Sequence, residues 1–117
     1  LWRTDGTASG TMLVRDVYPG KRSSNISAMI VLNDVLIFSA DDGQTGKELW
    51  KCDGTADGTQ LLLDVFAGFN HSDPRSFVVK QGYVYFTAYN GTIRTLYKTN
   101  GRSCGSINVT NNTDVNL

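Results

Sequence analysis

The sequence is poor in the residues that build metal and catalytic centres. One His and two Cys among 117 residues are too few for the four-ligand Cys/His sites of the common structural zinc modules. Its one Glu is Glu48, so a glycosidase with paired carboxylates would need to recruit aspartates. No apolar run approaches the roughly 18 residues of a membrane-spanning helix. We therefore expect neither a zinc module nor a membrane span.

Neither sign of charge is in excess. Eleven Lys and Arg balance eleven Asp and Glu, for a formal net charge of +0, so no global field favours nucleic acid or an anionic membrane as a partner. A hydrophobic content of 40% with 10% aromatics suffices for the core of one domain. The chain opens Leu1-Trp2-Arg3 without an initiator Met or a signal-peptide pattern, and we expect a mature piece or a fragment.

An internal repeat is the dominant feature that the sequence does have. Residues 1–20 (LWRTDGTASGTMLVRDVYPG) align with residues 49–68 (LWKCDGTADGTQLLLDVFAG) at an offset of 48. The same offset aligns residues 29–43 with residues 77–91, and a weaker third copy follows. A fixed period of this length is typical of repeat architectures. The predicted units are a first β-repeat at 1–48, a second at 49–95 and a partial third at 96–117.

Each period contains four short segments rich in β-branched and aromatic residues, separated by Gly, Asp and Asn turn signals. The predicted strands are 12–18, 28–32, 35–40 and 47–52, then 60–66, 76–80, 83–88 and 95–99. Asn33-Asp34 and Gln81-Gly82 stand where two-residue hairpin turns are needed. The chain is therefore predicted to be all-β, with repeated four-stranded antiparallel units like β-propeller blades, about two full repeats plus partial strands at both ends.

The repeated phrase itself resembles a known family. Residues 48–59 read ELWKCDGTADGT, which is similar to the ELWxxDGTxxGT repeat of secreted and surface proteins. The opening LWRTDGTASGT lacks only the Glu, and the turn SADDG at residues 39–43 is also similar to that family's sequences. The resemblance implies an extracellular, propeller-like β-repeat without an agreed enzymatic activity.

The Asp-Gly-Thr phrases are interpreted as turns. A carboxylate can accept backbone N–H bonds across a tight turn, and Gly supplies the positive φ. A calcium site is the alternative, with oxygens from Asp41, Asp42 and either Asp16 or Asp64. The second period lacks the aspartate pair, so we expect no cofactor.

One aromatic recurs in every period, as Trp2, Trp50 and Tyr97. We predict that these three residues form a repeat core packed between blades, and an exposed platform that stacks on sugar is the alternative.

Catalysis finds little support in the sequence. Asp64, His71 and Ser72 are the only combination that resembles a nucleophilic triad, and no G-x-S-x-G elbow accompanies them. His71 is interpreted as a solvated loop residue. We predict that the protein is not an enzyme.

Sequons for N-glycosylation are in excess. Nine Asn and twenty-one Ser and Thr give a chance expectation of about 1.6, whereas five sequons are present. The predicted glycan acceptors are Asn25, Asn70, Asn90, Asn108 and Asn111. Asn25 and Asn70 occupy nearly equivalent long connections, and turn chemistry is the alternative explanation of the excess.

The two cysteines, Cys52 and Cys104, have no counterpart in the other copies. We predict that they form a disulfide that holds neighbouring periods together, since sequons imply an oxidising compartment that permits one. Two free buried thiols are the alternative.

Two functions compete on these grounds. The leading hypothesis is a secreted, glycosylated structural protein whose partners are copies of itself or neighbouring repeats, joined head to tail by strand completion into a filament or surface layer. The alternative is a segment of a larger propeller adhesin or lectin that binds carbohydrate or protein through exposed aromatics such as Tyr18, Phe69 or Tyr89.

Overall fold

The computed structural model describes residues 1–19, 24–63, 70–101 and 107–108. The strands are β1 (Trp2–Arg3), β2 (Met12–Leu13), β3 (Met29–Leu32), β4 (Val35–Asp41), β5 (Lys47–Cys52), β6 (Gln60–Leu63), β7 (Arg75–Lys80), β8 (Tyr83–Tyr89), β9 (Arg94–Thr99) and β10 (Ile107–Asn108). All their pairings are antiparallel. No helix that could cross a membrane occurs in these residues. The all-β prediction is confirmed for the described chain.

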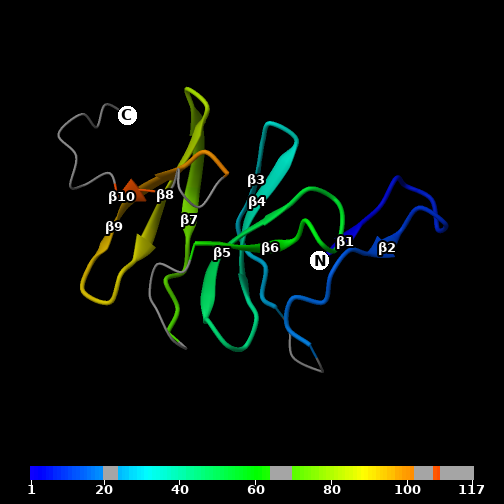
Figure 1. Cartoon of the computed structure of the whole chain (residues 1–117), viewed down its shortest axis with the longest axis horizontal. Helices are drawn as coiled ribbons and strands as arrows, with labels where there is room; N and C mark the ends of the chain where they lie inside the picture. The colour runs from blue at the N-terminus through cyan, green and yellow to red at the C-terminus, as the bar shows by residue number, and fades with distance from the viewer. Residues whose placement is uncertain (20–23, 64–69, 102–106, 109–117) are drawn as a thin grey trace.

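The strands form three sheets that follow one another across the molecule (Figure 1). Sheet A consists of β1 and β2, sheet B has the order β3-β4-β5-β6, and sheet C has the order β7-β8-β9-β10. Within each sheet, neighbouring strands are therefore also consecutive in sequence. Hairpins connect the strands within each sheet wherever the structure describes the connection.

Two tight turns set the register of sheets B and C. Asn33 and Asp34 have φ of 50° and 66°, and Gln81 and Gly82 have φ of 53° and 79°. Positive φ at both central residues matches the right-handed twist of the flanking strands, which is why Asn, Asp and Gly favour such hairpins. Both predicted turns are confirmed.

The four strands of one period were expected to share one sheet, and this grouping is wrong. β2, the first strand of the first period, pairs with β1, and β6, the first strand of the second period, pairs with β5. The physical reason is that each Asp-Gly-Thr loop is a hairpin connection, whereas long connections follow β2 and β6. The boundary between residues 48 and 49 consequently lies inside β5.

Sheet B carries a hydrophobic face on each side. Its C-side face (the face toward sheet C) and sheet C share one buried cluster, made of Leu32, Ile37, Leu49, Leu62, Val84, Phe86 and Ala88. Its A-side face shares a second cluster with the N-terminal segment, made of Phe38, Ala40, Trp50, Cys52, Val14 and Val17. Full burial of such large apolar side chains stabilises a fold by about 1.5–3 kcal/mol each, so sheet B is the centre of the molecule.

The strand registers recur at the 48-residue offset. The pairs Trp2↔Leu13 and Arg3↔Met12 of sheet A correspond to Trp50↔Leu61 and Lys51↔Gln60 of sheet B. An aromatic pair also recurs, because Phe38 lies opposite Trp50 and Phe86 lies opposite Tyr97.

Candidate functional site

Both complete Asp-Gly-Thr loops are organised by the same hydrogen bonds. Asp53 Oδ1 accepts the Thr55 N–H at 3.0 Å and the Thr55 hydroxyl at 2.7 Å, and Thr55 Oγ1 in turn accepts the Gly58 N–H at 3.0 Å. The Thr59 hydroxyl closes the loop on the Thr55 carbonyl at 2.7 Å. The first loop repeats every one of these bonds at the 48-residue offset. The turn interpretation of the motif is confirmed for these two loops.

The second glycine of the motif is required by the aspartate. A Cβ atom placed on Gly58 would overlap the Asp53 carboxylate, and one on Gly10 would overlap that of Asp5. Gly54, the first glycine, instead supplies φ of +100°. The two glycines of the motif therefore do different work.

The motif aspartates are held as carboxylates. The Thr55 hydroxyl, followed by its backbone N–H, holds the pKa of Asp53 below the ordinary value of 3.8, and Thr7 acts in the same way on Asp5. Burial alone would raise the pKa of Asp42, but hydrogen bonds from Thr45 and Gln44 together outweigh it and hold the pKa below its ordinary value. These carboxylates serve turns.

The calcium alternative required oxygens from Asp41, Asp42 and either Asp16 or Asp64. Asp41 Oδ1 accepts the Gly43 N–H at 2.8 Å, and Asp42 Oδ1 accepts three bonds from Gln44 and Thr45. Asp16 is exposed, and Asp64 lies outside the described residues. Among the residues that the structure describes, no cluster of three potential metal ligands is present.

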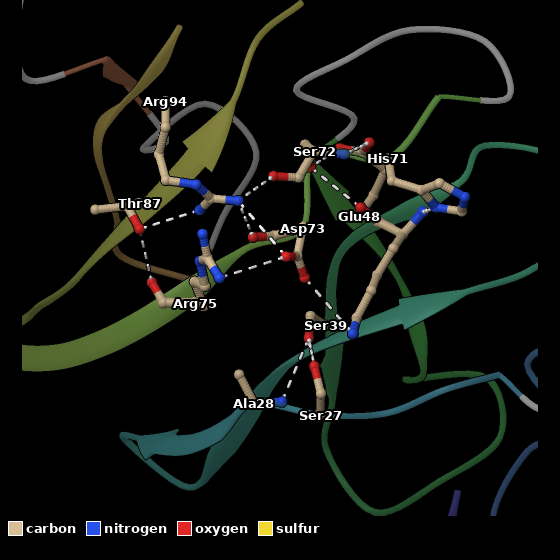
Figure 2. Close-up of polar contacts among 11 residues, drawn as sticks. Ser27, Ala28, Ser39, Glu48, His71, Ser72, Asp73, Arg75, Thr87 and Arg94 are labelled. Carbon is tan, nitrogen blue, oxygen red and sulfur yellow. Dashed lines mark hydrogen bonds and ion pairs between the residues drawn. The ribbon is translucent and has the colours of Figure 1, made fainter.

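A buried polar junction joins sheet B to the segment that precedes sheet C (Figure 2). Glu48 in β5 and Ser72 are both fully buried. The Ser72 N–H donates to Glu48 Oε2 at 3.0 Å, and its hydroxyl donates to Oε1 at 2.5 Å. The N–H groups of Ser72 and Asp73 also donate to the Lys47 carbonyl, at 3.1 and 3.0 Å. This Glu48–Ser72 junction satisfies polar groups that would be costly to bury alone.

Charged side chains surround the junction. Asp73 forms ion pairs with Lys47 at 3.6 Å and with Arg94 at 3.6 Å, and Arg75 lies at 4.0 Å. Arg94 also donates to the Asp73 carbonyl at 3.1 Å. The sequence did not lead us to these four residues. The sequence did contain one signal for the junction itself, which is that Ser24 and Ser72 are separated by the repeat offset of 48.

The triad-like combination is not assembled in the described residues. The Ser72 hydroxyl donates to Glu48, and His71 Nδ1 accepts the Lys47 N–H at 2.7 Å. The imidazole is largely exposed, and Asp64 lies outside the described residues. His71 and Ser72 therefore act as junction residues.

The three recurring aromatics have unequal surroundings. Trp50 is 5% exposed and Trp2 is 65% exposed, so the expected equivalent packing is wrong for Trp2. β4 and β6 flank Trp50 on either side, whereas β1 pairs only with β2 among the described strands. The Trp50 indole N–H is buried without a described hydrogen-bond partner, so Trp50 contributes by packing.

Tyr97 packs in the cluster between sheets B and C, stacked on Phe86 with ring centroids 5.7 Å apart. Burial raises the pKa of Tyr97, a hydrogen bond with the Asn90 side chain opposes this, and the charge of Glu48 raises it further.

Two hollows flank Trp2 on the A-side of sheet B. One is a cavity of about 240 Å³ whose lining includes Leu1, Val14, Val31 and Leu36, and the other is a wider groove bordered by Trp2, Leu13, Ile26 and Met29. Met29 and Val31 of β3 are 52% and 61% exposed. The outer edge of β1, which is the edge opposite β2, therefore stands beside uncovered apolar surface.

The sequons differ in their surroundings. Asn25 and Asn70 are exposed, whereas Asn90 is half-buried and its Oδ1 accepts the N–H groups of Thr92 and Ile93. Asn108 lies opposite Tyr97 in β10, and Asn111 lies outside the described residues.

Asn25 and Asn70 are not equivalent in the fold. The Asp41 N–H donates to the Ser24 carbonyl as the Tyr89 N–H donates to the Ser72 carbonyl. Asn25 therefore corresponds to Asp73, and both have positive φ, 53° and 47°.

Cys52 has a free, buried thiol on the A-side face of sheet B. Its sulfur accepts hydrogen bonds from the Gly54 N–H and the Thr59 hydroxyl, at 3.1 and 3.0 Å. Cys104 lies outside the described residues. The structure thus gives the Cys52–Cys104 disulfide no support.

The aromatics named for a lectin-like surface are only partly exposed where the structure describes them. Tyr18 is half-buried and lies so close to Gly43 that a Cβ there would meet its ring. Tyr89 ends β8 with 37% exposure, and Phe69 is not described.

No protein-family model, curated protein or solved structure matches the chain.

Proposed function

We propose that this chain is an extracellular, glycosylated structural β-repeat that joins like units head to tail by strand completion, building a filament or a surface layer. The observation that carries the proposal is the outer edge of β1. β1 and β2 have the register of β5 and β6, but β5 has β4 on its other edge and β1 has no described strand there. An unpaired edge beside exposed apolar side chains is a template for strand addition.

The finer fold assignment belongs to the same proposal. Sheets B and C have the same strand order, pack face to face and repeat the Phe-aromatic pair. This arrangement supports treating each sheet as a propeller-blade-like unit that receives one neighbour on each face. A heterologous contact between such units produces a ring if the rotation closes and a filament if it does not.

An extracellular location is supported by the sequons. Asn25 and Asn70 are exposed, as a glycan acceptor must be.

Assembly is tested on protein secreted from a eukaryotic host. Light scattering and electron microscopy should detect species larger than the monomer, whose chain mass is 12.8 kDa. Trp2→Lys places a charge at the outer edge of β1 and should shift the distribution toward monomer, while Ile93→Lys, at an exposed position far along the chain, should not. Dispersed monomers at high concentration would contradict the assembly proposal.

The adhesin or lectin alternative has one observation in its favour, which is the 65% exposure of Trp2. An exposed indole can stack on a sugar ring. Glycan-array binding that is lost in Trp2→Ala would favour this second candidate.

A further inference from the structure

The interior of the molecule contains a filled version of the cavity beside β1. Ile37 of β4 is fully buried, in one cluster with Leu49, Leu62 and Val84. Ile37 reaches this cluster because it pairs with Lys51 in the middle of sheet B.

The cavity beside β1 is lined by the same set shifted by one repeat. Leu1, Val14 and Leu36 line it. At the 48-residue offset these positions correspond to Leu49, Leu62 and Val84. Val31, which also lines the cavity, shifts to Val79 of β7. A cavity of about 150 Å³ with aliphatic and aromatic walls holds benzene in an engineered protein, so about 240 Å³ accommodates one aliphatic side chain.

The wider groove beside Trp2, which Met29 borders, gives a second, independent comparison. Phe77 of β7, which corresponds to Met29 of β3, is partly buried against the shared cluster of sheets B and C. Met29 itself is 52% exposed. The two strands β3 and β4 supply the cover in sheet B, so the equivalent cover over Met29 and Val31 is a two-stranded ribbon.

We infer that the outer edge of β1 binds a β-hairpin of a partner chain, whose inner strand pairs antiparallel with β1 and carries an aliphatic residue followed by Phe. The aliphatic residue lies opposite Arg3 and enters the cavity, as Ile37 lies opposite Lys51. The Phe lies opposite Trp2, as Phe38 lies opposite Trp50. The inference rests on the strand completion proposed above and specifies the chemistry of the completing strand.

A synthetic peptide of residues 28–42 carries this pattern at Ile37-Phe38 and the hairpin turn at Asn33-Asp34. Anisotropy of the labelled peptide, titrated with the unsubstituted protein, should show saturable binding. In the Trp50→Phe variant, whose fold is checked by circular dichroism, Trp2 emission should shift to shorter wavelength as the indole is covered. The same peptide with Ile37→Lys should bind about tenfold more weakly or worse, because it would place a charge in an apolar cavity.

The matched variants of the protein are Val31→Lys and Val78→Lys. Both valines are exposed on edge strands, at 61% and 57%, but only Val31 lines the cavity. Val31→Lys should weaken peptide binding about tenfold or more, and Val78→Lys should leave it unchanged.

Equal binding of the two peptides, or no binding up to the solubility limit, would overturn the inference even if the protein assembles. So would a Trp2 shift produced by oligosaccharides and not by the peptide. Ile37-dependent binding supports the inference even if the protein stays monomeric, in which case the assembly proposal alone fails.

Discussion

The aspartate and the two glycines of the Asp-Gly-Thr-Ala-x-Gly-Thr phrase have separable physical tasks. The aspartate gathers N–H and hydroxyl donors, the first glycine supplies a left-handed backbone, and the second glycine leaves room for the carboxylate. The same network in both loops explains why the phrase recurs almost unchanged while the strands around it vary.

Gly58→Ala tests the steric task. The added methyl overlaps the Asp53 carboxylate, and overpacking of this kind costs about 1–3 kcal/mol. In an Asp53→Ala background the obstacle is gone, so the same substitution should cost much less. Urea unfolding of the two single variants and the double variant measures the coupling. Additive costs would show that the overlap is relieved without strain.

Acid sensitivity tests the electrostatic task. The pKa of Asp53 is lower in the folded protein than its ordinary 3.8, so its stabilising contribution is complete above about pH 4 and is lost as pH falls through the folded pKa. Asp53→Asn should flatten the decline of the urea midpoint between about pH 5 and 2. Asp57→Asn, at an exposed position in the same loop, is the control. An unchanged acid limb in Asp53→Asn would contradict the assignment.

At the scale of elements, the Glu48–Ser72 junction ties β5 to the start of sheet C. Ser72→Ala removes the hydroxyl donor of a fully buried carboxylate and should lower the free energy of unfolding by about 1.5–3 kcal/mol. Ser27→Ala is the control. It should lower the free energy of unfolding less, since Ser27 is exposed and its hydroxyl contacts the neutral hydroxyl of Ser39, at 3.0 Å.

The junction also predicts a local signature. Hydrogen exchange of the Ser72 and Asp73 amides, which donate to the Lys47 carbonyl, should accelerate in Ser72→Ala more than exchange in the β8–β9 pairing. Uniform acceleration would mean that the junction acts on global stability only.

Most strands were predictable because their signals are local, but the strand expected at 12–18 is shorter, since β2 ends at Leu13. β-branched runs and the Asn33-Asp34 and Gln81-Gly82 turns fix β3, β4, β7 and β8 to within one residue of expectation. The grouping of β2 and β6 was not predictable, because a repeat boundary in sequence says nothing about which flanking strand each segment pairs with.

The candidate site was predictable only in part. The period identified Trp2, Trp50 and Tyr97 as equivalent, but burial depends on what lies beside each strand. Trp2 is exposed because β1 has one described neighbour and β5 has two. Similarly, Ser72 was considered as a nucleophile because no local signal reveals its hydrogen-bond partner. That partner, Glu48, lies 24 residues away in sequence.

For the whole molecule, glycan occupancy is predicted to follow exposure. Asn25 and Asn70 should be modified, and Asn90 should be modified less, because its side chain is half-buried and bonded within its own turn. Peptide mapping after enzymatic deglycosylation in heavy-oxygen water marks each occupied site. Asn33, which is in no sequon, is the internal control. If Asn25 and Asn70 were both unmodified in natively sourced protein, the excess of sequons would be explained by turn chemistry and not by glycosylation.

The pairing of strands that are consecutive in sequence has a kinetic consequence. Every pairing within a sheet joins strands adjacent in sequence, so no sheet waits for a distant segment to close a long loop. Chains with such local wiring have low contact order and fold quickly for β proteins. Because sheet B takes strands from both sides of residue 48, we expect the local pairing of the span 29–63 to form as one unit, and the sequence period does not coincide with that unit.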